Sequence, residues 1–197
     1  GVLADFTFGF TSLAASMGRT PVAVHGDEQP QWHYDFHVDP VWAEVDKSRV
    51  FWENLEPLID EDDLSAIWAA EQEATIVYVT GRRDSAAEQT KRWLIDCDLP
   101  EGALYFSKDD KAEVYAALRH QIIGAIDDKP DILLADYGVP MVARAWPYNA
   151  HVTTVPRVST VAAFIDRLGV KATRAASTSG WQAPLLPADW LDGANEE

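Results

Sequence analysis

The sequence predicts an α/β protein with a mostly parallel sheet, and three observations support this fold class. Short apolar runs rich in β-branched residues alternate with stretches of helical periodicity, which is the pattern of repeated βαβ units. Glycine, proline or acidic residues mark the turns between them. With 197 residues, 47% of them apolar and 11% aromatic, the chain is long and apolar enough to fold as one domain with its own core.

Each element follows from the local pattern. The apolar runs predict strands at residues 74–79, 104–106, 122–126 and 139–145. Helical spacing predicts helices at residues 84–94, from 111 to about 118, at 130–134 and at 160–168. Pro130 suits the first turn of its helix, Ser159 or Thr160 can cap the last helix, and Gly169 can end it.

The region before residue 74 differs from the rest, because helical patterns and aromatic residues dominate it. The sequence divides accordingly into a core of residues 1–9 and 74–170, a small, mainly helical cap insertion of residues 10–73, and a C-terminal arm of residues 171–197. Within the cap, residues 32–39 alternate large apolar side chains with His or Asp. A strand with two unlike faces is therefore expected there.

The charge of the chain bears on its partners. Acidic side chains number 32 against 16 basic ones, which gives a formal net charge of −16. Polymeric nucleic acid is not an expected partner, because affinity for it comes mainly from Lys and Arg on phosphates. No apolar run reaches the roughly 18 residues that a membrane span needs, and no basic segment opens the chain, so we expect a cytoplasmic protein without a membrane partner. The single cysteine, Cys97, excludes an internal disulfide.

Polar clusters fall at the carboxyl ends of predicted parallel strands, where ligands bind in open sheets. The clusters are Thr80-Gly81-Arg82, residues 108–111 and Asp127-Asp128. A glycine turn with a hydroxyl, an ammonium group and paired carboxylates are the parts of a phosphoryl-transfer site, since donors and cations neutralise phosphate while carboxylates hold Mg²⁺. Each cluster alone is more often a turn or a helix cap. The order and spacing of all three indicate phosphate chemistry.

In this order the clusters resemble the second, third and fourth motifs of the haloacid dehalogenase (HAD) superfamily. The matching residues are Thr80-Gly81-Arg82 after a strand, Asp110-Lys111 at the start of a helix, and Ile126-Asp127-Asp128-Lys129-Pro130-Asp131 after another strand. This last stretch and the segments that contain Asn149 and Arg157 are similar to the 5'(3')-deoxyribonucleotidase branch. The resemblance covers residues 1–168 and implies a Rossmann-like, three-layer α/β/α sandwich with an inserted cap.

The resemblance also implies a reaction and its site residues. The reaction is hydrolysis of a phosphomonoester through an aspartyl-phosphate, with Mg²⁺ as cofactor and a (deoxy)nucleoside monophosphate as the small phosphorylated substrate. Thr80, Gly81, Arg82 and Lys111 would bind the phosphate, and Thr80 and Lys111 would also be catalytic. Asp127 and Asp128 would hold Mg²⁺, and the sequence leaves open which of them is the direct ligand.

The first motif can be placed in two frames. The residues Gly1-Val2-Leu3-Ala4-Asp5-Phe6 resemble those that follow the nucleophile in the pattern Asp-x-Asp-Gly-Val-Leu-Ala-Asp-Phe, and both catalytic aspartates would then precede Gly1. In the other frame Asp5 is the nucleophile, and Thr7 takes the place of the second aspartate. Two alternatives to a nucleotidase follow: a phosphatase for a sugar phosphate or another small organophosphate, and a non-catalytic binding protein of the same fold that lacks the nucleophile.

Two groups of residues in the predicted cap have both a functional and a structural interpretation. One face of the expected strand would carry His33, Asp35, His37 and Asp39. They could bind a transition metal, although neighbours about 7 Å apart allow one ion at most two of them, or they could form a solvated surface. The cap aromatics could stack on a nucleobase or form the cap core, and Phe36 and Trp52 are the candidates for substrate contact.

Overall fold

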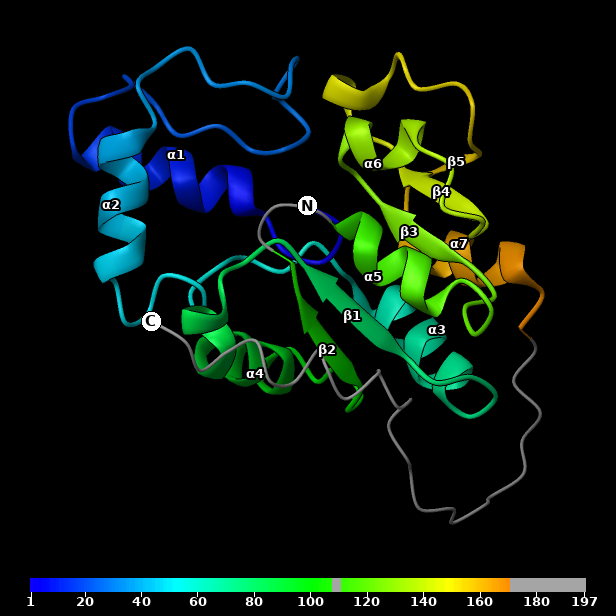
Figure 1. The fold of residues 1–197 in the computed structure, drawn as a ribbon. Coiled ribbons are helices and arrows are strands. Elements are labelled where there is room, and N and C mark those ends of the chain that lie inside the picture. The colour runs from blue at the N-terminus through cyan, green and yellow to red at the C-terminus, as the bar shows by residue number, and fades with distance from the viewer. Residues whose placement is uncertain (108–110, 171–197) are drawn as a thin grey trace.

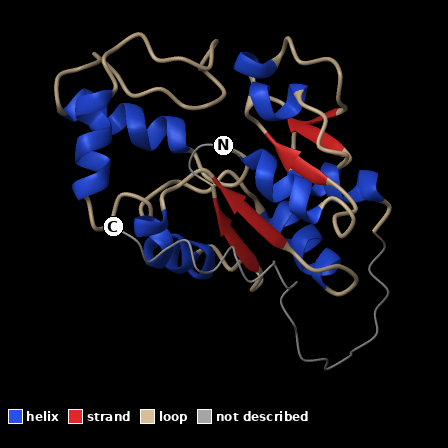
Figure 2. Cartoon of the chain, in the orientation of Figure 1, coloured by secondary structure: helices blue, strands red, loops and turns tan. Residues whose placement is uncertain are grey.

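The computed structural model describes residues 1–107 and 111–170, in which short parallel strands alternate with helices (Figures 1 and 2). The strands are β1 (Val77–Thr80), β2 (Ala103–Phe106), β3 (Ala125–Asp127), β4 (Met141–Arg144) and β5 (Arg157–Val158). The α-helices are α1 (Phe6–Ser16), α2 (Asp39–Lys47), α3 (Glu61–Glu71), α4 (Ala87–Asp96), α5 (Lys111–Leu118), α6 (Pro130–Leu134) and α7 (Val161–Leu168). Two short 3₁₀ helices are η1 (Asp84–Ala86) and η2 (Pro147–Asn149). The predicted arm and residues 108–110 lie outside the described residues.

The strands form two parallel ladders. β1 pairs with β2 in the register that runs from Val77 opposite Ala103 to Thr80 opposite Phe106. The other ladder has the order β3-β4-β5. Among residues 1–107 and 111–170, no ladder joins β1 to β3. The protein is therefore an α/β structure with open parallel sheets, as the sequence predicts.

Side chains of both ladders contribute to the same two apolar clusters. Tyr78 of β1 and Ile126 of β3 belong to one cluster, which also receives side chains of α3, α4 and α7. Val79 and Ala125, their neighbours along the two strands, belong to the other, together with side chains of α5 and α6. Because successive residues of a strand point to opposite faces, each cluster covers one face of the strands. Figure 1 shows the helices on both sides of the strands.

The predicted strands at 74–79, 104–106, 122–126 and 139–145 correspond to β1 to β4, with ends displaced by at most three residues. The last predicted helix corresponds to α7. Thr160 caps α7 by accepting a hydrogen bond from the Ala163 N–H at 3.1 Å, and Gly169 ends it with a φ of +69°. The sequence did not predict β5, which is only two residues long.

The predicted strand over residues 32–39 is wrong. These residues form bends, and α2 begins at Asp39. Their exposure still alternates, because Tyr34 and Phe36 are half-buried while Asp35 and His37 are exposed. A strand needs a neighbouring backbone with which to form a ladder, and the described chain places none beside this segment. The alternation indicates only which side chains face the aromatic cluster of α1 and α2.

The helices of the predicted cap pack in two places. Phe10 and Ala14 of α1 meet Val41 and Val45 of α2 in an aromatic-rich cluster of their own. In contrast, α3 packs against α7 in the cluster that covers one face of the strands. The boundary of the cap at residue 73 stays a prediction.

Within the described ranges, no helix has both the length and the apolar character that crossing a bilayer requires.

Candidate functional site

Asp127, the last residue of β3, lies at the centre of a polar network. Its Oδ2 accepts hydrogen bonds from Lys111 Nζ at 2.8 Å and from the Tyr115 hydroxyl at 3.1 Å. Lys111 and Tyr115 are four residues apart on α5, so both side chains lie on the same face of the helix. Its Oδ1 accepts from the backbone N–H groups of Asp128 at 2.8 Å and Lys129 at 3.0 Å. Four donors therefore hold the Asp127 carboxylate in place.

The electrostatics of this network favour a charged lysine. Burial alone would lower the pKa of Lys111, but the carboxylates of Asp127 and Asp128 and the hydrogen bond to Asp127 outweigh burial and raise it. The ammonium group therefore stays charged at neutral pH. It is a fixed cation at the carboxyl end of β3, close to two carboxylates.

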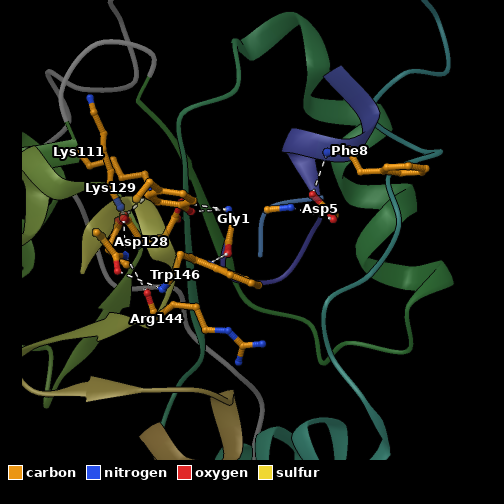
Figure 3. A network of polar contacts seen from close by, with 12 residues as sticks. Gly1, Asp5, Phe8, Lys111, Asp128, Lys129, Arg144 and Trp146 are labelled. Atoms are coloured by element: carbon orange, nitrogen blue, oxygen red, sulfur yellow. Dashed lines mark hydrogen bonds and ion pairs between the residues drawn. The ribbon is translucent and has the colours of Figure 1, made fainter. Parts of the chain in front are cut away.

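Asp128 points to a second set of partners (Figure 3). Its Oδ2 accepts a hydrogen bond from the Tyr148 hydroxyl at 2.7 Å and lies 3.0 Å from the backbone nitrogen of Gly1. Burial opposes its charge, whereas the nearby Lys111 ammonium group and the hydrogen bond from the Tyr148 hydroxyl favour the charged form. Asp128 is therefore an ionised carboxylate held on one of its two oxygens.

Asn149 of η2 holds the backbone of Asp128 in place through its side chain. Its side-chain amide is fully buried and donates to the carbonyl oxygens of Asp128 at 2.9 Å and Arg144 at 2.8 Å. Its Oδ1 accepts from Arg157 Nη1 at 2.9 Å. In the same loop, the Trp146 indole donates to the Gly1 carbonyl at 2.8 Å. The segment after β4 thereby fixes both Asp128 and Gly1 at the carboxyl end of the strands.

Thr80 and Gly81 form the turn at the end of β1. The Thr80 hydroxyl oxygen accepts a hydrogen bond from the Arg82 N–H at 3.2 Å, which leaves the hydroxyl proton able to bind another acceptor. A Cβ built on Gly81 would meet only the Ser107 carbonyl, at 3.8 Å, so the turn is open. Hydroxyl and amide donors therefore lie at the carboxyl end of β1, and among the described residues no hydrogen bond joins them to Lys111.

Arg82 points elsewhere. Its guanidinium lies over the rings of Trp52, at 4.8 Å, and Trp93, at 5.6 Å, and donates to Thr90 Oγ1 at 3.0 Å. These partners belong to α4 and to the segment after α2. Arg82 therefore faces the α2 side of β1, whereas Lys111 faces Asp127.

The two candidate substrate aromatics pack with other rings. Phe36 lies 6.2 Å from Phe10, and the Trp52 ring is stacked on Phe6 at 5.6 Å between ring centroids. Trp32 contacts the candidate site instead, in an edge-on arrangement with Tyr148 whose ring centroids are 5.3 Å apart. Contact of Phe36 and Trp52 with a substrate stays a prediction.

The His and Asp residues of 33–39 lie apart from this site. His37 Nε2 is 3.0 Å from Asp39 Oδ2, and both side chains are exposed, which fits a solvated surface. Across the two described ranges, no group of three or more His, Cys, Asp or Glu residues could hold a metal ion.

Sequence reasoning missed several partners in the network. Tyr115 could have been found from its spacing of four residues to Lys111 on one helix. No such local signal exists for Tyr148, or for His25, which lies 2.9 Å from Asp5 Oδ2 across 20 residues of sequence. Asp5 itself caps α1 by accepting from the Phe8 N–H at 2.9 Å, so both of its oxygens are engaged, and the choice between the two frames of the first motif stays open.

Comparison with known proteins shows a similarity over part of the chain. No protein-family model matches the chain. A Bacillus cereus protein named "Putative nucleotidase" is 31% identical to it over 88 residues. The match covers 43% of this chain and 46% of that protein, so the chain spans less than half the length of the relative. A nucleotidase-type protein is therefore what this chain is similar to over part of its length.

Proposed function

We propose that the protein is a Mg²⁺-dependent phosphomonoester hydrolase of the HAD type that acts on nucleoside monophosphates. The observation that carries the proposal is the ion pair of Lys111 with Asp127 at the end of β3, with the carboxylate of Asp128 close by. The Thr80-Gly81 turn at the end of β1 adds open hydroxyl and amide donors. The similarity to a protein named as a nucleotidase supports a nucleotide as the substrate.

The packing of the helices supports the HAD-type sandwich. Two apolar clusters cover opposite faces of the strands, one with α3, α4 and α7 and the other with α5 and α6. One edge of β1 and one edge of β3 have no ladder partner among the described residues, yet both strands contribute to the same clusters. A parallel strand between them would join the ladders into one sheet. We infer that the Asp-x-Asp pair of the first motif lies on such a strand, which would end where Gly1 meets Asp128.

The described residues would then have separate roles in phosphate transfer. Lys111 would offset negative charge on the phosphate and on the attacking carboxylate. The Thr80 hydroxyl and the Gly81 N–H would donate to phosphate oxygens. The first aspartate would attack phosphorus as the ester oxygen leaves with a proton from the second aspartate, and water would then hydrolyse the aspartyl-phosphate.

Asp128 suits Mg²⁺ better than Asp127 does. Both oxygens of Asp127 already accept hydrogen bonds from two donors each. The described side-chain contacts of Asp128 use only Oδ2, which leaves Oδ1 for a cation. Since the described residues hold no group of three ligands, Asp128 is one ligand of an incomplete set, and the first-motif aspartates would supply others. Bound Mg²⁺ would neutralise charge on the phosphate.

A phosphate-release screen of the full-length native protein tests the proposal. Nucleoside 5'- and 3'-monophosphates would be compared with sugar phosphates in millimolar Mg²⁺. We expect a kcat/KM at least about tenfold higher for nucleotides, because one set of base contacts is worth a kcal/mol or more. A preference for sugar phosphates would overturn the nucleotide assignment, and release from none of the compounds would overturn the hydrolase.

A further inference from the structure

A cavity of about 910 Å³ opens beside the end of β1, between α2 and the turn into α4. Gly81 and Arg82 line it on the side of β1, and Trp42 and Trp52 line it on the side of α2. Lys111, Asp127 and Asp128 are not among its lining residues. The cavity therefore shares Gly81 with the proposed hydrolase site, but its arginines and its α2 wall have no role in that site.

The walls of the cavity are rich in cations although the protein is strongly acidic. Five of its 16 basic residues line the cavity: Lys47, Arg49, Arg82, Arg83 and Arg92. Three acidic residues also line it. Three of the five basic residues have carboxylate partners, Lys47 with Glu44, Arg83 with Asp46 and Arg92 with Glu53, so Arg49 and Arg82 are the lining cations without an ion pair in the described part of the chain. In a chain with a net charge of −16, a wall with more basic than acidic residues favours an anionic ligand.

Arg82 is a cation without a carboxylate beside it. Its contacts are the rings of Trp52 and Trp93 and the Thr90 hydroxyl, and no described carboxylate forms an ion pair with it. Burial lowers the pKa of Arg82 to about 10, so the guanidinium is still charged at neutral pH. A partly buried charge without a counter-charge is costly, and an anion in the cavity would relieve this cost.

Arg49 lies on the same cavity from the segment after α2. Its side chain is exposed, and in the described part of the chain it has no ion-pair partner. Arg49 can therefore move to meet a ligand without breaking an existing contact. Its loss is also not expected to destabilise the fold, which makes it the best position for a test.

We propose that this cavity binds the phosphoryl group of a small phosphorylated molecule between Arg82 and Arg49, apart from the Lys111-Asp127 pair. Guanidinium groups match the oxygens of phosphate in pairs of charge-assisted hydrogen bonds. The volume of about 910 Å³ is in the range of sites for small molecules. The binding is independent of Mg²⁺, because the cavity supplies arginines rather than paired carboxylates.

Calorimetric titration of the full chain with sodium pyrophosphate tests the proposal. A chelator would be present so that pyrophosphate cannot bind to the protein through a divalent cation. We expect Arg49→Ala and Arg82→Met each to weaken binding by about tenfold or more, since each removes a charge-assisted hydrogen bond. Arg19→Ala, an exposed arginine outside the cavity, should bind as the parent does. Circular dichroism checks that Arg82→Met folds, and Arg49→Ala keeps the test decisive if it does not.

Lys111→Met separates this cavity from the proposed hydrolase site. Pyrophosphate should still bind to a folded Lys111→Met variant with unchanged affinity. Absence of binding, or binding that Lys111→Met abolishes while Arg49→Ala leaves it intact, would overturn the proposal. Because the titration measures binding without metal, its result does not depend on whether the protein hydrolyses phosphomonoesters.

The phosphoryl group could belong to a substrate with a second phosphate or to a separate effector. Competition with pyrophosphate by a nucleoside 3',5'-bisphosphate distinguishes the two, and this arm rests on the proposed function. If the bisphosphate displaces pyrophosphate less effectively from Lys111→Met than from the parent, the cavity binds the second phosphate of a substrate that spans both sites. If the bisphosphate displaces pyrophosphate equally well from both proteins, the cavity binds a separate effector.

Discussion

Lys111 Nζ and Asp127 Oδ2 form an ion pair 2.8 Å long between the start of α5 and the end of β3. The side chains are 19% and 2% exposed, so water compensates little if one partner is lost. Lys111→Met should therefore lower the free energy of unfolding by about 3 kcal/mol, because it leaves a buried carboxylate without its cation. Urea denaturation at neutral pH measures this change.

The exposed pair of Lys91 and Glu88 provides the matched control for Lys111. Lys91→Met should change the free energy of unfolding by less than about 0.5 kcal/mol, since exposed pairs contribute little. A loss below about 1 kcal/mol for Lys111→Met would contradict the view that the pair is a strong internal contact.

Tyr115 should stabilise the protein through its hydroxyl. The hydroxyl donates to Asp127 Oδ2 at 3.1 Å, and the ring is buried. Tyr115→Phe keeps the ring and should cost about 1 to 2 kcal/mol in unfolding free energy, as expected for a hydrogen bond to a charged group. Tyr105→Phe, whose hydroxyl has no described hydrogen bond, should cost almost nothing in the same urea titration. Equal effects of the two variants would remove the role assigned to the Tyr115 hydroxyl.

His25 should make stability depend on pH. Its hydrogen bond to Asp5 raises the pKa of His25 above the ordinary value of 6.5, against a smaller opposing effect of burial. A raised pKa in the folded state means that His25 contributes stability fully below pH 6.5, and that this contribution is lost as the pH rises through the raised pKa.

The measurement is a urea titration of the parent and of His25→Gln near pH 5.5 and pH 8.5. The parent should be favoured over the variant more strongly at the lower pH. A difference between the two proteins that is the same at both pH values would show that the charge of His25 does not act through Asp5.

Asp63 of α3 should be a strong structural contact between α3 and α7. It is buried, its Oδ1 accepts from the Ala162 N–H of α7 at 2.7 Å, and its Oδ2 lies 4.0 Å from Arg144 Nη1. Asp63→Ala would leave the Ala162 N–H without its acceptor and the buried Arg144 without its nearby carboxylate, and should cost about 3 kcal/mol or more. Asp62→Ala, an exposed neighbour in the same helical turn, should cost less than about 0.5 kcal/mol. Similar losses in the two variants, measured by thermal or urea unfolding, would contradict this role.

The sequence predicts β1 to β4 because each is a short apolar run with a turn signal, and α7 because Thr160 and Gly169 mark its ends. It fails at residues 32–39 for a physical reason. Alternation of Tyr34 and Phe36 with His and Asp reports burial on one side, and a strand also requires a partner backbone that only tertiary structure supplies.

The candidate site also has features that the sequence predicts and features that it does not. Asp127 and Lys111 are predictable because each follows from the element that ends or begins there. The Lys111–Asp127 contact joins residues 16 positions apart, and the hydrogen bond from Tyr148 to Asp128 joins residues 20 positions apart. Helical or strand periodicity in the sequence cannot predict contacts over such separations. The orientation of Arg82 toward Trp52 was also unpredictable, because it depends on how α2 and α4 pack.

The rate of phosphate release from a nucleoside 5'-monophosphate by the full-length native protein is the most direct test of the proposed Mg²⁺-dependent hydrolysis. It would be measured with and without Mg²⁺, for the parent and for Asp128→Asn. We predict that release requires Mg²⁺ and that Asp128→Asn lowers kcat/KM by about a hundredfold or more, because it weakens a carboxylate ligand of the cation. Release that is equally fast without Mg²⁺, or unchanged in a folded Asp128→Asn variant, would contradict the account.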